Sequence, residues 1–242
     1  MTETLVAASY QETQPEGRVV IGASSVSIGG NRLISSCVPV VFLLDDEPGM
    51  VVRLGRVLRA AGFSVGGWTS STEFLDTHDA DSPGCLVTNL RMPGISGLEI
   101  QRALLARGVD RPIIFITGQG DIRTVVEGMR AGAVTFLTKP VQPAELTGAV
   151  REAIAIDATR RARRRAQAAI GARLAQLTPR ERQVFHLVIK GMLNKQIAAE
   201  LGTTVKTVKV HRGRILNKMH VRNSTALLGL LYRTKSYGYQ VA

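Results

Sequence analysis

Four apolar runs in the first part of this 242-residue chain are each followed by side chains that could do chemistry. The runs cover residues 39–44, 85–88, 112–116 and 133–137, and the polar residues beyond them are Asp45 and Asp46, Asn89, Thr117, and Lys139. Two adjacent carboxylates suit a hard cation such as Mg²⁺, which prefers oxygen ligands. A hydroxyl and an ammonium that face one point suit a phosphoryl group. These residue types therefore predict a site for a cation and a phosphoryl group.

The same runs predict the elements that position this site. Runs buried on both faces are typical of parallel strands, and residues 64–68 form a weaker fifth run. Helical patterns separate the runs, which predicts an α/β doubly wound, flavodoxin-like sheet. Ser96 and Glu99 form a predicted capping box, and Asp121 is a predicted N-cap. Because ligands of such sheets bind beyond the carboxyl ends of the strands, the polar residues should converge there.

This constellation resembles the receiver domain of two-component response regulators over roughly residues 39–157. The matching motifs are Asp45-Asp46, residues 89–94, Thr117-Gly118 and Lys139-Pro140. The resemblance implies a Mg²⁺ site formed by Asp45, Asp46 and the backbone carbonyl of Arg91. It implies that Thr117 and Lys139 bind phosphoryl oxygens and that Phe136 is a switch aromatic, turning inward when Thr117 moves toward phosphate. A sensor histidine kinase is the implied partner.

Asn89 departs from the pattern of that family, which has an aspartate at the phosphoacceptor position. A carboxamide has no anionic oxygen and is a poor nucleophile, so the chain is predicted not to form an aspartyl phosphate. One anionic ligand is also lost, so Mg²⁺ should bind more weakly. Asn89 is either an engineered Asp→Asn substitution or the native residue of an atypical receiver. The engineered substitution fits slightly better, because the other residues of the site are retained: Asp45, Asp46, Thr117 and Lys139.

The charge of the chain is strongly asymmetric. Residues 158–242 hold 18 Lys and Arg but only Glu181 and Glu200 as acidic residues, a net charge of +16. Residues 1–157 hold 13 Lys and Arg against 17 Asp and Glu, a net charge of −4. An excess this one-sided repels itself unless something neutralises it, so it favours a polyanion partner over a merely solvated basic surface.

A compact helical pattern occupies the basic end of the chain. Thr178, Pro179 and Glu181 give an N-cap, a proline at the first helical position and a capping box. Asn194 is predicted to cap a second helix, Gly202 to end it, and Ser224 to cap a fourth helix, after a third that starts near Val205. This order is that of a helix-turn-helix, whose second helix lies in the major groove. Six apolar residues are spaced to pack the helices together: Ile197, Ala198, Leu201, Val208, Ile215 and Leu216.

This segment resembles the LuxR-type helix-turn-helix of the FixJ/NarL class of response regulators. The resemblance implies that residues 194–213 hold the motif, that residues 205–219 form the recognition helix, and that the last helix dimerises. Double-stranded promoter DNA is the implied partner, bound by a homodimer. The candidate DNA-contacting residues are Asn194, Lys195, Lys206, Thr207, Lys209, Val210, His211, Arg212, Arg214 and Lys218.

These observations predict four segments: a flexible N-terminal extension (1–37), a receiver domain (38–157), a basic helical linker (158–174) and a LuxR-type DNA-binding domain (175–242). No secretory signal or membrane-spanning run is expected, and Cys37 and Cys85 are too few for a disulfide framework, so a cytoplasmic protein is predicted. The predicted function is that of a DNA-binding transcriptional regulator of a two-component phosphorelay. The alternatives are a phosphorylation-independent regulator and a kinase-sequestering adaptor. No catalytic residue is assigned, and an enzyme is not expected.

Overall fold

The computed structural model describes residues 18–19, 38–118 and 122–235. The chain divides into two compact units, Met1–Ala158 and Thr159–Ala242. The first unit contains a six-stranded sheet with helices, and the described part of the second consists of helices and turns. Within the described ranges, no helix combines the length and the apolar character needed to cross a membrane.

A parallel sheet forms the centre of the first unit. Its strands lie in the order β3-β2-β4-β5-β6, and each neighbouring pair is parallel. From β2 the chain moves first to one edge and then back across β2 to the other, which confirms the predicted doubly wound fold. The weaker fifth run is confirmed as β3. The five strands are β2 (Val40–Leu44), β3 (Ser64–Trp68), β4 (Gly84–Asn89), β5 (Ile113–Thr117) and β6 (Thr135–Thr138).

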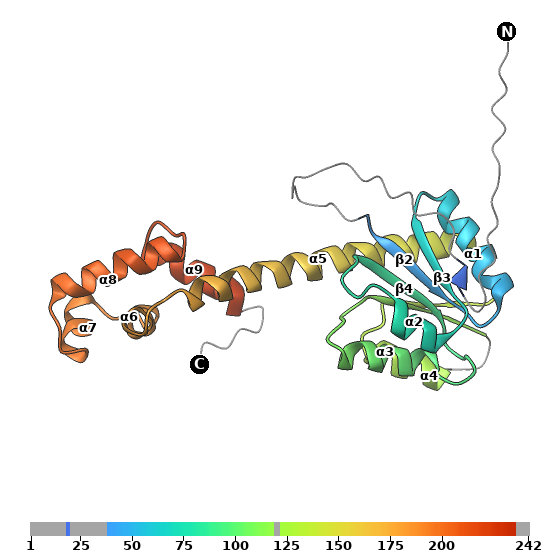
Figure 1. Cartoon of the computed structure of the whole chain (residues 1–242), viewed down its shortest axis with the longest axis horizontal. Helices are drawn as coiled ribbons and strands as arrows, with labels where there is room; N and C mark the ends of the chain where they lie inside the picture. The colour runs from blue at the N-terminus through green and yellow to red at the C-terminus, as the bar shows by residue number, and fades with distance from the viewer. Residues whose placement is uncertain (1–17, 20–37, 119–121, 236–242) are drawn as a thin grey trace, which may run out of the picture. The chain divides into compact units, whose positions relative to one another are not determined.

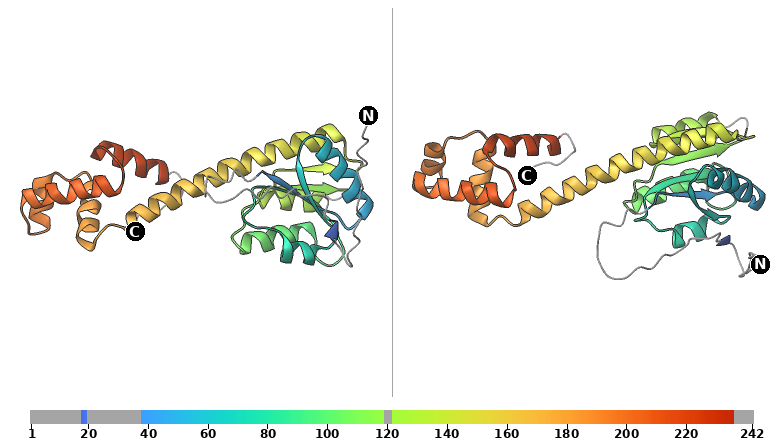
Figure 2. Two further views of the ribbon diagram at one scale, coloured as in Figure 1. Left: turned by 45° about the horizontal axis from the view of Figure 1, so that its top comes forward. Right: turned by 90° about the horizontal axis from the view of Figure 1, so that it is seen from above.

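Helices cover both faces of the sheet (Figures 1 and 2). Successive side chains of β2 point to opposite faces, so Val41 and Leu43 pack in the cluster of α1 and α5, whereas Phe42 and Leu44 pack in the cluster of α2 and α3. α4 lies on the second face, where Gly128 approaches the ring of Phe115. The helices are α1 (Pro48–Ala60), α2 (Ser71–Thr77), α3 (Gly97–Ala106), α4 (Ile122–Arg130) and α5 (Pro143–Ala175).

One short strand interrupts the segment predicted to be flexible. β1 (Arg18–Val19) pairs antiparallel with β3, with Arg18 opposite Trp68 and Val19 opposite Gly67. For these two residues the prediction of an unpacked extension is wrong, because the edge strand β3 offers unpaired backbone groups that an extended segment can satisfy. The rest of 1–37 lies outside the described residues, as does the predicted N-cap Asp121.

A buried contact ties α5 to the start of β4. The backbone amide of Gly84 donates a hydrogen bond to Oδ2 of Asp157 at 2.8 Å, and Asp157 is 1% exposed. Gly84 has φ of +137°, and a Cβ atom there would lie 1.8 Å from the carbonyl oxygen of Val40. Only glycine fits this position, so the contact depends on both residue types.

The second unit packs four helices and the end of α5 around one core. Ile170 of α5 joins Phe185, Val208, Ile215 and Leu227 in a single buried cluster. The predicted capping box of Thr178 and Glu181 is confirmed, as is that of Ser96 and Glu99 in the first unit. The four helices are α6 (Pro179–Ile189), α7 (Asn194–Glu200), α8 (Val205–Lys218) and α9 (Ser224–Lys235).

Two predicted helix caps are displaced by one residue. Asn194 and Ser224 are the first helical residues of α7 and α9, not the N-caps. The backbone amide of Leu193 donates to Oε1 of Gln196 at 2.7 Å, and Oδ1 of Asn223 accepts from the amide of Ala226 at 2.8 Å. The prediction was wrong because the side chains of Asn194 and Ser224 have another partner, described below.

Candidate functional site

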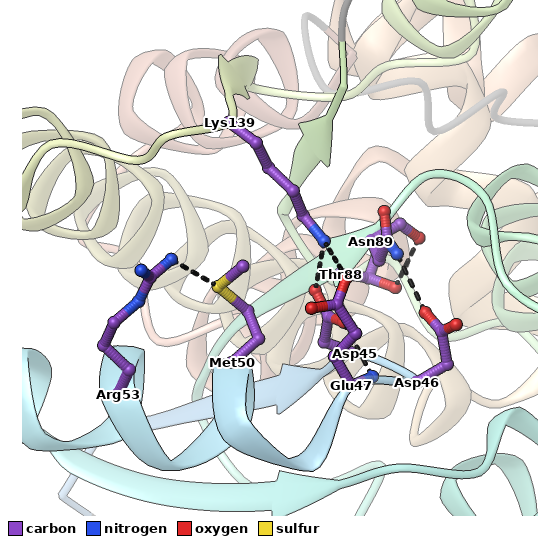
Figure 3. A network of polar contacts seen from close by, with 8 residues as sticks. All are labelled: Asp45, Asp46, Glu47, Met50, Arg53, Thr88, Asn89 and Lys139. Atoms are coloured by element: carbon purple, nitrogen blue, oxygen red, sulfur yellow. Dashed lines mark hydrogen bonds and ion pairs between the residues drawn. The ribbon is translucent and has the colours of Figure 1, made fainter.

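The polar residues predicted at the strand ends do lie along the carboxyl edge of the sheet. Asp45 directly follows β2, Asn89 and Thr117 end β4 and β5, and Lys139 directly follows β6. Figure 3 shows Lys139 reaching toward Asp45, with Asn89 beside Asp46. The doubly wound topology therefore brings residues from distant parts of the chain to one place.

Lys139 pairs with two carboxylates at this edge. Its Nζ lies 3.1 Å from Oδ2 of Asp45 and 3.3 Å from Oε1 of Glu47. Burial acts to lower the pKa of Lys139, but hydrogen bonds and charge from Asp45 and Glu47 raise it overall. Lys139 therefore stays charged and offsets part of the negative charge of the site. Glu47 was missed from the sequence, although it is the third consecutive acidic residue after β2.

Asp45 is a fully buried carboxylate, and the surrounding protein only partly offsets the cost of burying its charge. Burial raises its pKa above the ordinary value of 3.8, and the charge of Asp46 adds to this effect. The backbone amide of Glu47, which donates to Oδ1 at 3.0 Å, and the ammonium of Lys139 act in the opposite direction. The net rise in pKa means that the surroundings only partly compensate the buried charge, so a cation here would stabilise the ionised form.

Asn89 presents a donor to its acidic neighbour. Its Nδ2 donates to Oδ1 of Asp46 at 2.9 Å, and the Thr88 hydroxyl donates to the backbone carbonyl of Asn89 at 3.2 Å. Asn89 is 9% exposed. An aspartate in this place would set a second carboxylate against Asp46 instead of an amide N–H.

The oxygen atoms of Asp45 and Asp46 have the chemistry that Mg²⁺ prefers. In the described part of the chain no group of three Asp, Glu, His or Cys side chains is arranged to hold a metal ion. Asn89 can add only a neutral oxygen, after its NH₂ turns away from Asp46. These residues fit Mg²⁺ in that they would offer it two anionic side chains.

Three further receiver residues were predicted from the sequence. Thr117 is buried, and its hydroxyl donates to the backbone carbonyl of Gly118 at 3.1 Å. Phe136 on β6 is 42% exposed, so its ring faces outward. Arg91 is exposed in the loop after β4.

A second candidate site lies on α8, which follows α7 after a short turn. Thr204 caps α8, accepting from the amide of Thr207 at 3.1 Å. Val208 and Ile215 on the inner face are buried. Thr207 and His211 are half-buried. The candidate DNA-contacting residues with exposed side chains are Lys195, Lys206, Lys209, Val210 and Arg214.

Arg212 has an internal role. One guanidinium nitrogen donates to Oδ1 of Asn194 at 2.6 Å, and another donates to Oγ of Ser224 at 2.6 Å. Arg212 thus joins the first residue of α7 to the first residue of α9. Spacings of four, three and four residues place Val208, Arg212, Ile215 and Met219 on one face of α8, which explains why Arg212 is half-buried. Arg212 and Asn194 therefore hold the helices together in this structure.

Lys218 is also engaged inside the unit. Its Nζ lies 2.6 Å from Oε2 of Glu181 and 3.0 Å from the carbonyl oxygen of Gln176. Glu181 is buried, and the backbone amide of Thr178 donates to its Oε2 at 2.9 Å. Burial acts to raise the pKa of Glu181, but Lys218 and Thr178 lower it below the ordinary value of 4.5.

The lowered pKa of Glu181 predicts that the second unit is sensitive to acid. Its ionised form contributes stability that is present above pH 4.5 and is lost as pH falls through the lower pKa of the folded state. Glu181→Gln should cost about 1–2 kcal/mol at pH 7 and flatten the acid dependence. Hydrogen exchange of α6 and α8 amides, corrected for intrinsic rates, measures both effects. The exposed Glu200→Gln is the control, and equal behaviour of the two variants would contradict the role of Glu181.

Comparisons with known proteins identify both domains of the chain. The model of the response regulator receiver domain matches residues 41–151, and that of the bacterial regulatory proteins of the luxR family matches residues 175–230. The response regulator protein TodT of Pseudomonas putida is 39% identical, covering 85% of this chain and 91% of TodT. The transcriptional regulatory protein FixJ of Bradyrhizobium diazoefficiens is 38% identical, covering 80% of this chain and 94% of FixJ.

Two solved structures match this chain over both of its domains. The response regulator StyR matches with a TM-score of 0.74 and 42% identity, covering 81% of this chain and 98% of StyR. Full-length FixJ from B. japonicum matches with a TM-score of 0.51 and 35% identity, covering 82% of this chain and 98% of FixJ. The chain therefore belongs to the two-component response regulators that carry a LuxR-type DNA-binding domain, and it is a transcriptional regulator of that family.

Proposed function

We propose that this regulator binds promoter DNA through α8 and that its receiver, with Asn89 in place, does not accept a phosphoryl group. The observation that carries the second part is the contact between Asn89 Nδ2 and Asp46 Oδ1 at 2.9 Å. A carboxamide that donates to a neighbouring carboxylate has no nucleophilic oxygen to offer a phosphohistidine. A sensor kinase could dock on this receiver, but the phosphoryl group would have no acceptor at position 89.

The remaining receiver residues keep the parts of a phosphoryl site. Asp45, Asp46 and the Arg91 carbonyl would hold Mg²⁺, which neutralises phosphoryl oxygens when bound, and the missing aspartate weakens this binding. Lys139 is the cation available to a phosphoryl oxygen, with the Thr117 hydroxyl as donor. The outward position of Phe136 fits a receiver in its unphosphorylated state.

Asn89 supports two versions of this function. If it replaces an aspartate, the chain is a regulator held in its unphosphorylated form. If it is native, the regulator responds to another signal, such as a partner or ligand that shifts the population of DNA-competent molecules. An adaptor that only sequesters a kinase is less well supported, because α8 keeps exposed basic residues on its outer face.

The contacts within the second unit refine the proposed DNA-binding residues. We assign DNA contact to the exposed Lys206, Lys209 and Arg214, with Lys195, Thr207, Val210 and His211 beside them. Asn194, Arg212 and Lys218 act instead by positioning the helices. Phosphate contacts outnumber base contacts at most protein–DNA interfaces, so most of these lysines and arginines are expected to bind the backbone.

Dimerisation and domain limits complete the proposal. Val126 and Met129 on α4 and Phe136 on β6 are exposed apolar side chains, as is Leu228 on α9. If two molecules paired through these surfaces of the receiver and of α9, the dimer would bring two recognition helices to one operator. We place the receiver at 38–157, the linker at 158–174 and the DNA-binding domain at 175–242, which fits the division of the chain after Ala158.

DNA binding by α8 is tested with a single exposed lysine. Lys209→Ala should lower affinity for duplex DNA and reduce the slope of log K against log salt by about 0.9, the value for one lost phosphate contact. Fluorescence anisotropy across a salt series measures both. Lys190→Ala, an exposed lysine at the end of α6, is the control. Absence of binding by the parent chain at low salt would overturn the proposal.

A further inference from the structure

The second half of α5 carries a dense run of arginines. Arg160, Arg161, Arg163, Arg164 and Arg165 fall within six residues, and the last three have exposed side chains. No Asp or Glu occurs between Asp157 and Glu181. One continuous helix runs from Pro143 to Ala175. The arginine run is therefore a dense stretch of positive charge on one helix, with exposed guanidinium groups at Arg163, Arg164 and Arg165.

This arginine run belongs to the same compact unit as the recognition helix. Ile170 is buried in one cluster with Val208 and Ile215 of α8. The Arg173 guanidinium donates to the carbonyl of Met219 at 3.2 Å, and Lys218 Nζ to the carbonyl of Gln176 at 3.0 Å. The end of α5 is thus fastened to the end of α8. At 1.5 Å per residue, the run begins about 8 Å and ends about 15 Å along the helix from Ile170.

We infer that the arginine run binds the phosphate backbone of the DNA that flanks the sequence contacted by α8. This inference rests on the proposed DNA binding by α8. Guanidinium groups pair with phosphate oxygens in a bidentate geometry, and duplex DNA carries a charge about every 1.7 Å along its axis. The five arginines extend over about 7.5 Å of α5 and point to several of its sides. Some of them therefore face a duplex that lies next to this part of the helix.

DNA is favoured over an acidic protein as the occupant because α8 itself brings a duplex to this unit. The arginine run is attached to α8 through the contacts of Arg173 and Lys218, so DNA on α8 lies within tens of ångströms of it. A protein partner would need a separate binding event.

The test compares three triple variants of the full chain on one mixed-sequence duplex. Arg163, Arg164 and Arg165 are changed together to Gln, which keeps helix propensity, or to Lys, which keeps charge. The control changes Arg53, Arg56 and Arg59 on α1 to Gln and removes the same charge elsewhere. Fluorescence anisotropy gives the salt slope, and titration at low salt gives the number of base pairs that each protein molecule covers.

For the Arg→Gln run variant we expect the salt slope to fall by about two to three, near 0.9 for each lost contact, and the covered length of DNA to shrink. The Lys variant should retain most of both values, and the α1 variant should match the parent. An unchanged slope and covered length, or an equal loss in the α1 variant, would overturn the inference while Lys209→Ala still reports on α8. A parent chain that binds no duplex would overturn both proposals.

Discussion

Asn89→Asp will convert a chain that takes up no phosphate into one that becomes phosphorylated at position 89. The aspartate would stand at the end of β4, within reach of the Asp46 carboxylate and the cluster that contains Lys139. It supplies the anionic oxygen that attacks phosphorus and a third carboxylate for Mg²⁺. Mg²⁺ affinity should rise about tenfold or more, since about 1.4 kcal/mol of added attraction suffices. Incubation with acetyl phosphate and Mg²⁺, resolved on a phosphate-affinity gel, measures the gain.

The matched control adds Asp46→Asn to Asn89→Asp. That double variant keeps the nucleophile but loses a metal ligand, so it should be phosphorylated much more slowly than the single variant. Mass spectrometry then locates the phosphate. Phosphate on the parent chain within residues 89–94, at the level of Asn89→Asp, would disprove the account given for Asn89.

Gly84→Ala should unfold the receiver at markedly lower urea concentration. The new Cβ would lie 1.8 Å from the Val40 carbonyl oxygen, and φ of +137° is strained for any residue with a side chain. Relief requires a shift of β4, which also breaks the hydrogen bond from Gly84 to Asp157. We expect a loss of about 3 kcal/mol or more. The fluorescence of Trp68, the single tryptophan and a buried residue stacked on Phe42, reports on this unit.

Gly148→Ala provides the control for the glycine change. Gly148 lies within α5, no atom comes within 4 Å of a Cβ built on it, and its φ is not positive. Alanine there should leave the receiver as stable or raise its stability by about 0.5–1 kcal/mol. If Gly84→Ala and Gly148→Ala unfold at the same urea concentration, the steric argument is wrong.

The sequence was informative where a pattern repeats or a cap is local. Apolar runs predicted the parallel strands, and the order of polar residues after them predicted one shared edge, because topology alone brings strand ends together. The pairing of β1 with β3 could not be predicted, since two residues carry no periodic signal. Contacts between side chains at that edge could not be predicted either, because the sequence around Lys139 does not indicate that it pairs with Glu47 as well as Asp45.

Arg212 is a residue for which charge and periodicity predict different roles. As an arginine in a basic helix it was predicted to contact DNA, yet its spacing from Val208 and Ile215 is that of the buried face. Asn194 and Ser224 were predicted as caps because of their residue type, whereas their side chains accept from Arg212. When a single basic residue occupies a position on the apolar face of a helix, its spacing should therefore count for more than its charge in predicting its role.

The position of Arg212 divides α8 into two sets of residues with different freedom to change. Val208, Arg212 and Ile215 are tied to neighbouring helices, so substitution there disturbs the whole unit. Lys206, Lys209 and Arg214 project from the other side and support no described contact inside the unit. New operator preferences can therefore arise by exchanging the outer residues alone, and a regulator of this kind can be redirected to other genes without rebuilding its fold.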